Sequence, residues 1–188
     1  MTFFAGLFAG LRDADRSLTK QAASRIPPRA GKVLSAVEEV AENSKLWCGA
    51  AAAMACLGGR RGRGVAVSGM AALTVAQLIS NGLCKHLADR PRPPKDWFPH
   101  DEVDDRPDSS SFPSGHTAAA VAFTAAVAST APVAGAACAL PAAMVALERV
   151  QSGAHYPSDV VTGAAIGLAG AWLTRHAPRL VLRHRLAR

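Results

Sequence analysis

Three short polar clusters in this chain contain the residue types that a phosphoryl transfer requires. They occupy residues 85–93, 111–117 and 149–159, and each lies at the end of an apolar stretch. An imidazole can act as a nucleophile or as an acid near neutral pH. One histidine could therefore attack phosphorus while a second protonates the departing alkoxide. The candidate pair is His155 for attack and His116 for protonation.

The same clusters supply three cations that suit a phosphate group: Lys85, Arg92 and Arg149. Arginine presents a planar fork that matches two phosphate oxygens, whereas lysine acts as a compact point charge. Charge on the equatorial oxygens must be held throughout phosphoryl transfer. We therefore expect these donors to stabilise mainly the transition state.

Two prolines indicate that the histidines lie beside helix N-termini. Pro113 suits the first turn of a helix, with Ser110 or Ser111 near the N-cap. The amides of Ser114 and Gly115 would then be free to bind an anion, and glycine lets an oxyanion approach the backbone.

Pro157 marks a second helix start in the same way. His155 would lie just outside this helix and Asp159 in its first turn. A carboxylate at this spacing can hold one ring nitrogen of the histidine and make the other nitrogen more nucleophilic.

Each cluster alone also has a structural explanation. A Ser-Gly-His triplet before an Ala-rich stretch is commonly a helix cap, and a lysine at a helix end commonly extends its charge to solvent. Glu148 beside Arg149 could form a surface ion pair. A catalytic site is favoured because all three clusters are expected at helix ends on the same side of the helical bundle.

Together the clusters resemble the three-part signature of the type 2 phosphatidic acid phosphatase superfamily: K-x6-R-P, then P-S-G-H, then S-R-x5-H-x3-D. The matching residues are Lys85 with Arg92 and Pro93, Pro113 to His116, and Arg149 with His155 and Asp159. The resemblance covers roughly residues 46–175. It implies an all-α, polytopic membrane helical bundle and a metal-independent phosphatase without a cofactor.

The resemblance also implies residue roles. His155 would be the nucleophile, Asp159 its orienting partner and His116 the general acid. The residues implied to bind the substrate phosphate are Lys85, Arg92, Ser114, Gly115 and Arg149. The chain departs from the signature at Glu148, where the family often has serine. We expect this carboxylate to pair with Arg149 and orient it.

The segments that would position these clusters are apolar blocks. The chain has 188 residues, of which 49% are hydrophobic and only 5% aromatic, so small apolar residues that let helices pack closely dominate. The blocks are residues 46–59, 65–84, a pair divided by Pro132 that runs from 117 to 147, and 160–173. Crossing a bilayer takes roughly 20 apolar residues, a length that only 65–84 clearly reaches. We expect about five spans.

The sequence divides into three parts. Residues 1–45 predict two amphipathic, peripheral helices separated at Pro27 and Pro28, and this part shows no pattern that predicts chemistry. Residues 46–175 form the helical core, and 176–188 a basic tail. The positive-inside rule places the arginines of residues 60–63 and the tail in the cytoplasm. The three clusters would then face the extracytoplasmic side of a multi-pass cell-membrane protein.

The net charge of +7 suits contact with anionic lipid headgroups. Nucleic acid is not expected as a partner, because no nucleic-acid-binding motif is present and the basic residues do not alternate with aromatics. A zinc site would need closer clustering of Cys and His than this chain has. Nothing in the sequence indicates an oligomeric state.

These observations predict hydrolysis of a membrane lipid phosphate through a phosphohistidine. Candidate substrates are polyprenyl phosphates or diphosphates, phosphatidate and similar lipids, and an outward-facing site favours a polyprenyl carrier. Vanadium-dependent haloperoxidases and soluble acid phosphatases share the anion cradle, but a short chain with apolar blocks favours a lipid phosphatase. A non-catalytic membrane scaffold is the alternative of another class.

Overall fold

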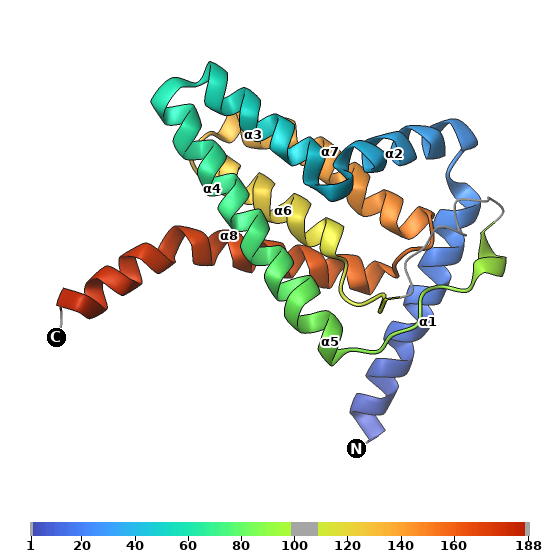
Figure 1. Cartoon of the computed structure of the whole chain (residues 1–188). Helices are drawn as coiled ribbons and strands as arrows, with labels where there is room; N and C mark the ends of the chain where they lie inside the picture. Colours follow the sequence, from blue (N-terminus) through green and yellow to red (C-terminus); the bar gives the residue numbers. More distant parts are fainter. Residues whose placement is uncertain (1, 99–108, 187–188) are drawn as a thin grey trace.

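The computed structural model describes residues 2–98 and 109–186, and all regular elements in these ranges are helical (Figure 1). The all-α architecture expected from the sequence is therefore confirmed. The α-helices are α1 (Thr2–Arg25), α2 (Pro28–Ala41), α3 (Lys45–Leu57), α4 (Gly59–Gln77), α5 (Lys85–Leu87), α6 (Gly115–Ala128), α7 (Pro132–Gln151) and α8 (Pro157–Leu186). A π-helical segment, η2 (Leu78–Cys84), joins α4 to α5, and 3-10 turns occur at η1 (Glu42–Ser44) and η3 (Lys95–Trp97).

Prolines determine where the helices of the second half begin. Pro132 is the first residue of α7 and Pro157 is the first residue of α8. Proline suits this position because its fixed φ matches the helix and its missing N–H would have no partner there. The division of residues 117–147 at Pro132 and the helix start at Pro157 are both as predicted.

The core is built around α6, which packs against α4, α7 and α8 (Figure 1). Ala118, Ala120 and Ala122 are completely buried on α6, and the Phe123 ring packs against Trp47 of α3 at a centroid distance of 5.3 Å. On α8, a Cβ at Gly167 would lie 2.6 Å from the carbonyl oxygen of Ala118. The absence of a side chain there lets α8 approach the α6 backbone closely.

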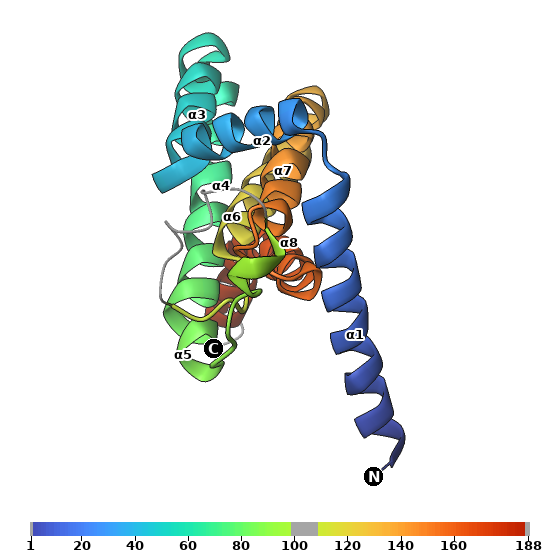
Figure 2. The same ribbon diagram turned by 90° about the vertical axis from the view of Figure 1, so that its right-hand side faces the viewer.

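The two N-terminal helices cover the end of this bundle. Figures 1 and 2 show α1 crossing the right-hand end of the bundle in Figure 1, where it contacts α7 and α8. Helix α2 packs on α7 and α3. Asp15 and Thr19 of α1 are buried. These helices therefore form part of the packed structure around the motif-bearing ends of the core helices.

Among the residues that the structure describes, two helical stretches are long and apolar enough to cross a membrane, by length and composition: Gly59–Leu87 and Pro132–Gln151. Helix α6 is apolar but shorter. Large apolar side chains on the outward faces, such as Val67, Leu78 and Leu140, are exposed, which suits contact with lipid rather than water. The segment predicted as a basic tail continues α8 as far as Leu186.

Candidate active site

The three polar clusters meet at one end of the bundle. Arg92, in the loop after α5, donates from Nη1 to the carbonyl of Ala154 at 2.6 Å. The Ser111 amide donates to the Arg90 carbonyl at 2.9 Å, and the Ser114 amide to the Asp159 carbonyl at 3.1 Å. These bonds join the loop after α5, the start of α6 and the turn between α7 and α8. Residues that are more than 60 positions apart in the sequence therefore share one site.

His155 lies in the turn between α7 and α8 and is only 3% exposed. Its Nδ1 is within hydrogen-bond distance of the Ser111 carbonyl oxygen. A carbonyl can only accept, so Nδ1 carries the proton and Nε2 keeps its lone pair. Burial lowers the pKa of His155, and the Arg92 and Arg149 charges add to this effect, while Asp159 opposes it. The imidazole is therefore neutral near pH 7, as a nucleophile requires.

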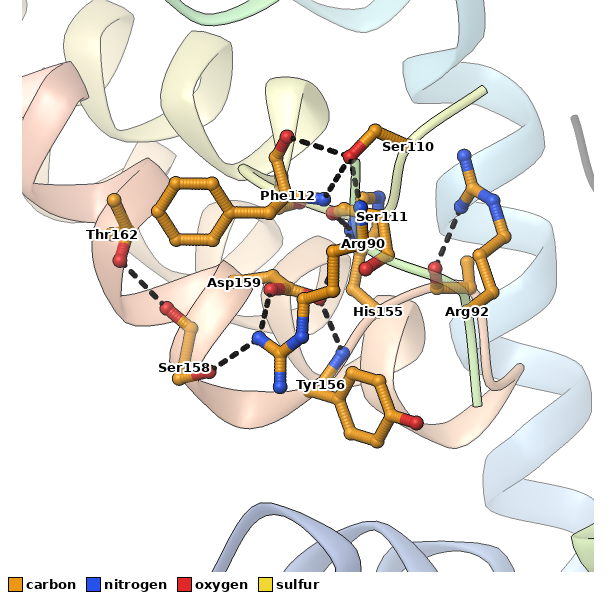
Figure 3. A network of polar contacts seen from close by, with 12 residues as sticks. Arg90, Arg92, Ser110, Ser111, Phe112, His155, Tyr156, Ser158, Asp159 and Thr162 are labelled. Atoms are coloured by element: carbon orange, nitrogen blue, oxygen red, sulfur yellow. Dashed lines mark hydrogen bonds and ion pairs between the residues drawn. The ribbon is translucent and has the colours of Figure 1, made fainter. Parts of the chain in front are cut away.

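Asp159 occupies the first turn of α8, as predicted, and is fully buried. Its Oδ2 lies 3.8 Å from His155 Nδ1 and accepts a hydrogen bond from the Tyr156 amide at 2.9 Å. The direct partner of His155 Nδ1 is thus the Ser111 carbonyl, and Asp159 adds its negative charge from a longer distance (Figure 3). Every residue has a backbone carbonyl, so the sequence could not indicate the Ser111 carbonyl as a partner of His155. It could indicate only the carboxylate of Asp159.

Arg90 is a site residue that the motif does not include. Its Nη1 donates to Asp159 Oδ1 at 2.5 Å and to Ser158 Oγ at 2.8 Å (Figure 3), and its Nη2 lies 2.7 Å from Asp15 Oδ2. The guanidinium also lies 4.2 Å from the centre of the Tyr156 ring. Burial alone would lower the pKa of Arg90, but Asp15 and Asp159 raise it above its usual value. Arg90 therefore fixes the carboxylate beside His155.

Arg92 and Lys85 lie on the other side of the His155 turn from this network of ion pairs. Besides its bond to Ala154, Arg92 donates from Nε to the Ser109 carbonyl at 3.2 Å. Lys85 Nζ lies 3.5 Å from Ser109 Oγ. Burial, followed by repulsion from Arg149, lowers the pKa of Arg92. An anion placed between these cations would relieve that repulsion, which is the electrostatic property of a phosphate cradle.

The residue that departs from the family signature pairs with its neighbour. Glu148 is 3% exposed, and its Oε2 accepts from both Nε and Nη2 of Arg149 at 2.5 Å. The expected pairing is thus confirmed. Because Glu148 binds two nitrogens of Arg149, the guanidinium keeps a fixed orientation at the end of α7.

The start of α6 differs from the prediction. Its N-cap is Ser114, whose Oγ accepts from the Thr117 amide at 3.4 Å; Ser110 and Ser111 are not the cap, and Pro113 precedes the helix. Serine at this position reaches the amide three residues on, which determines the boundary. The Ser114 amide, expected to be free, donates to Asp159 instead. The first helical amides that can face an anion are those of Gly115 and His116.

Gly115 also has a packing role. A Cβ at this position would collide with the side-chain amide of Asn81, which lies in η2. The glycine therefore allows α6 to begin directly against the helix that carries Lys85.

His116 projects from the first turn of α6 and faces a carboxylate from the N-terminal part of the chain. Its Nε2 lies 3.6 Å from Glu38 Oε1 of α2, and the same oxygen lies 2.9 Å from Arg149 Nη2. Residues 1–45, in which the sequence shows no pattern that predicts chemistry, thus supply two carboxylates that reach the site residues. Glu38 reaches the histidine and the arginine, and Asp15 reaches Arg90. Neither carboxylate belongs to a motif, and only the packing of α1 and α2 reveals them.

No group of three or more His, Cys, Asp or Glu side chains among the described residues could hold a metal ion. The chemistry available at this site consists of a buried neutral imidazole, a second imidazole next to a carboxylate, and three cations around the space between them.

A helical bundle whose helix ends join two histidines to a cationic cradle defines the class of protein. The sequence profile of the PAP2 superfamily matches residues 66–182. The chain belongs to the PAP2 superfamily, and the resemblance found in its motifs is confirmed. No curated protein sequence matches the chain with significance.

Two solved structures share the fold. One is the transmembrane PAP2-type phosphatidylglycerolphosphate phosphatase from Bacillus subtilis, with a TM-score of 0.69, 21% identity, and coverage of 92% of this chain and 88% of that one. The other is LpxE from Aquifex aeolicus, with a TM-score of 0.65, 23% identity, and coverage of 84% and 92%. Both likenesses extend over nearly the whole chain, including α1 or α2 in part, and concern the fold.

Proposed function

We propose that this protein is a membrane lipid phosphatase that works through a phosphohistidine at His155. The observation that carries the proposal is the state of this imidazole: it is buried and neutral, and the bond from Nδ1 to the Ser111 carbonyl leaves the lone pair on Nε2. Arg92, Arg149 and His116 all lie near enough to interact with its charge. A nucleophile beside cations and a second imidazole suits attack on a phosphate ester.

In the first step, the Nε2 lone pair of His155 forms a bond to phosphorus and the phosphorus–oxygen bond to the lipid breaks. His116 gives its proton to the departing oxygen, so the lipid leaves as an alcohol or, from a diphosphate, as a monophosphate. His155 becomes positively charged when phosphorylated. The Ser111 carbonyl and the Asp159 carboxylate stabilise this charge.

In the second step, His116 is neutral and acts as a base. It takes a proton from water as the water oxygen bonds to phosphorus, and the phosphorus–nitrogen bond breaks. The electron pair returns to Nε2 of His155, inorganic phosphate is released, and His116 is again protonated. The chain's own side chains supply every proton transfer, so the proposed mechanism is metal-independent.

The proposed phosphate ligands are Lys85, Arg92 and Arg149, together with Gly115 at the start of α6. The amide of Ser114 is bonded to the Asp159 carbonyl and its side chain is completely buried, so Ser114 is left out of this set. Lys85 and Arg92 already touch Ser109, and Arg149 is held by Glu148 and Glu38. Because these cations are oriented before substrate arrives, little reorganisation is needed as charge develops on the phosphoryl oxygens.

A lipid substrate is supported by the apolar helical stretches Gly59–Leu87 and Pro132–Gln151 and by the outward apolar side chains of the bundle. The neighbour from Bacillus subtilis is a phosphatidylglycerolphosphate phosphatase, which is consistent with this substrate class. The charge distribution favours a multi-pass arrangement with the site on the extracytoplasmic side, and with it a polyprenyl phosphate or diphosphate.

Phosphate release from a panel of polyprenyl and glycerolipid phosphates, measured on detergent-purified protein with EDTA, tests the proposal. We expect release that tolerates EDTA, is lost in His155→Ala and is retained in the control His86→Ala, whose imidazole is exposed at the end of α5. Trapping of acid-labile phosphate on the protein would identify the phosphohistidine.

Other outcomes would select the alternatives. Release from water-soluble esters but no lipid would indicate an acid phosphatase, and vanadate-dependent bromide oxidation would indicate a haloperoxidase. Turnover that survives His155→Ala would contradict the phosphohistidine mechanism. A folded wild-type protein inactive in all these assays would favour a scaffold.

A further inference from the structure

Glu38 of α2 lies between Arg149 and His116. One of its oxygens, Oε1, lies 2.9 Å from Arg149 Nη2 and 3.6 Å from His116 Nε2. Its side chain is 17% exposed, so the carboxylate is largely withdrawn from water. A carboxylate between a guanidinium and an imidazole is unexpected in an anion cradle, because its own charge opposes the binding of phosphate. A carboxylate at this position must therefore favour catalysis in another way that offsets its repulsion of phosphate.

The groups around His116 disfavour the protonated imidazole that a general acid requires. Burial lowers the pKa of His116 most, and the charges of Arg149 from α7, His155 from the turn before α8, Lys85 from α5 and Arg92 from the following loop lower it further, to about 3. A general acid must nevertheless carry its proton when substrate binds.

The other carboxylates of the site are directed elsewhere. Glu148 holds Nε and Nη2 of Arg149, and Asp159 pairs with Arg90 on the far side of His155. Glu38 is the carboxylate that the structure places against the His116 ring.

We infer that Glu38 is a positioning residue that aligns His116 and favours its protonated form for transfer of a proton to the leaving group. This inference rests on the proposed phosphatase function and deepens it. A negative charge beside an imidazolium favours the protonated form. The bond from the same oxygen to Arg149 fixes where that charge sits. Helix α2, outside the family signature, thus supplies a part of the acid–base machinery.

Leaving-group dependence separates this role from simple stabilisation of the fold. A lipid alkoxide needs a proton as it departs, whereas 4-nitrophenolate is stable without one. In Glu38→Gln, we expect kcat/KM for a lipid phosphate to fall about 10- to 100-fold, a fraction of what a general acid contributes. For 4-nitrophenyl phosphate we expect a change of less than about 3-fold, because that reaction does not draw on the acid.

Three further variants complete the test. His116→Asn should show the same selective loss, because it removes the acid itself. Glu39→Gln is the matched control, because it makes the same charge change one residue along α2 on an exposed side chain. Glu38→Asp keeps the charge and should recover part of the lost activity on the lipid phosphate.

The pH profile gives a second readout. Without the carboxylate, the His116 proton is held less tightly and is lost at lower pH. The alkaline limb of kcat/KM for the lipid substrate should therefore move to lower pH in Glu38→Gln and stay in place in Glu39→Gln.

Equal losses on both substrates with an unmoved alkaline limb would overturn the inference and leave the proposed function standing. Wild-type protein that releases phosphate from neither substrate would overturn the proposed function, and the role of Glu38 with it.

Discussion

Asp15 and Arg90, which are 75 positions apart in the sequence, form an ion pair with 2.7 Å between Oδ2 and Nη2. Asp15 also accepts from the Ser158 amide at 2.9 Å and from Ser158 Oγ at 2.6 Å. Asp15 therefore caps the start of α8. It also binds the Arg90 guanidinium, which in turn binds Asp159. Through one buried carboxylate, α1 is bound to α8, the helix that follows His155.

Replacing Asp15 with Ala should destabilise the protein. The change leaves the start of α8 uncapped and removes one partner of a largely buried pair. We expect a loss of about 2 to 4 kcal/mol, below the upper range for buried pairs because Arg90 is partly exposed and keeps Asp159. Thermal unfolding in detergent measures the effect. Asp13→Ala, on the exposed face of α1, is the control and should leave the unfolding temperature nearly unchanged.

Arg90→Lys should fail to replace arginine. The guanidinium uses separate nitrogens for Asp159 and Asp15, a geometry that a single ammonium cannot reproduce. We expect a loss of about 1.5 to 3 kcal/mol, the range for hydrogen bonds to charged groups. Unfolding and kcat are the measurements, with Arg63→Lys on the exposed surface of α4 as the control. A fully stable, fully active Arg90→Lys protein would show that charge alone suffices.

The motif residues and the main helix boundaries could be predicted because their signals are local. Pro132 and Pro157 begin helices by their own covalent geometry, and the pairing of Glu148 with Arg149 joins neighbours in the chain. The meeting of Lys85, His116 and His155 at one end of the bundle followed from the alternation of apolar blocks. These inferences needed no knowledge of how the helices pack.

The remaining site residues depend on packing between distant segments. Asp15 and Glu38 are acidic residues in amphipathic helices, and such residues usually face solvent. Their roles arise only because α1 and α2 lie across the end of the bundle. The helix cap at Ser114 was misplaced because Ser110, Ser111 and Ser114 are all good caps, and sequence alone does not choose among them.

The acid limb of the pH profile should report His155. Its pKa is lowered below the usual value of 6.5, so the midpoint of the acid limb should lie below pH 6.5. Asp159 raises this pKa, so Asp159→Asn should move the acid limb further down and also lower the plateau rate. The measurement is kcat/KM against pH for the wild type and Asp159→Asn on one substrate. Ionisation of the substrate then affects both profiles equally. A limb that moved upward would contradict the assignment.

The contact between α8 and α6 can be tested with paired glycine substitutions. In Gly167→Ala the new Cβ would lie 2.6 Å from the Ala118 carbonyl oxygen, and backbone cannot move aside as a side chain can. We expect a loss of about 1 to 3 kcal/mol from overpacking. Gly64→Ala in α4 meets nothing within 4 Å and should instead gain about 0.5 to 1 kcal/mol from helix propensity. Opposite shifts in unfolding temperature are the expected result.

The bond between Asp15 and Ser158 spans 143 positions, and this separation constrains the order of events during biosynthesis. Asp15 leaves the ribosome early, whereas its partner at the start of α8 is translated only after the other core helices. The nascent chain therefore carries this carboxylate without its Ser158 partner through most of its synthesis. Completion of the site is therefore one of the last steps of maturation, and fragments that stop before α8 lack one of the two residues that bind Asp15 of the first helix.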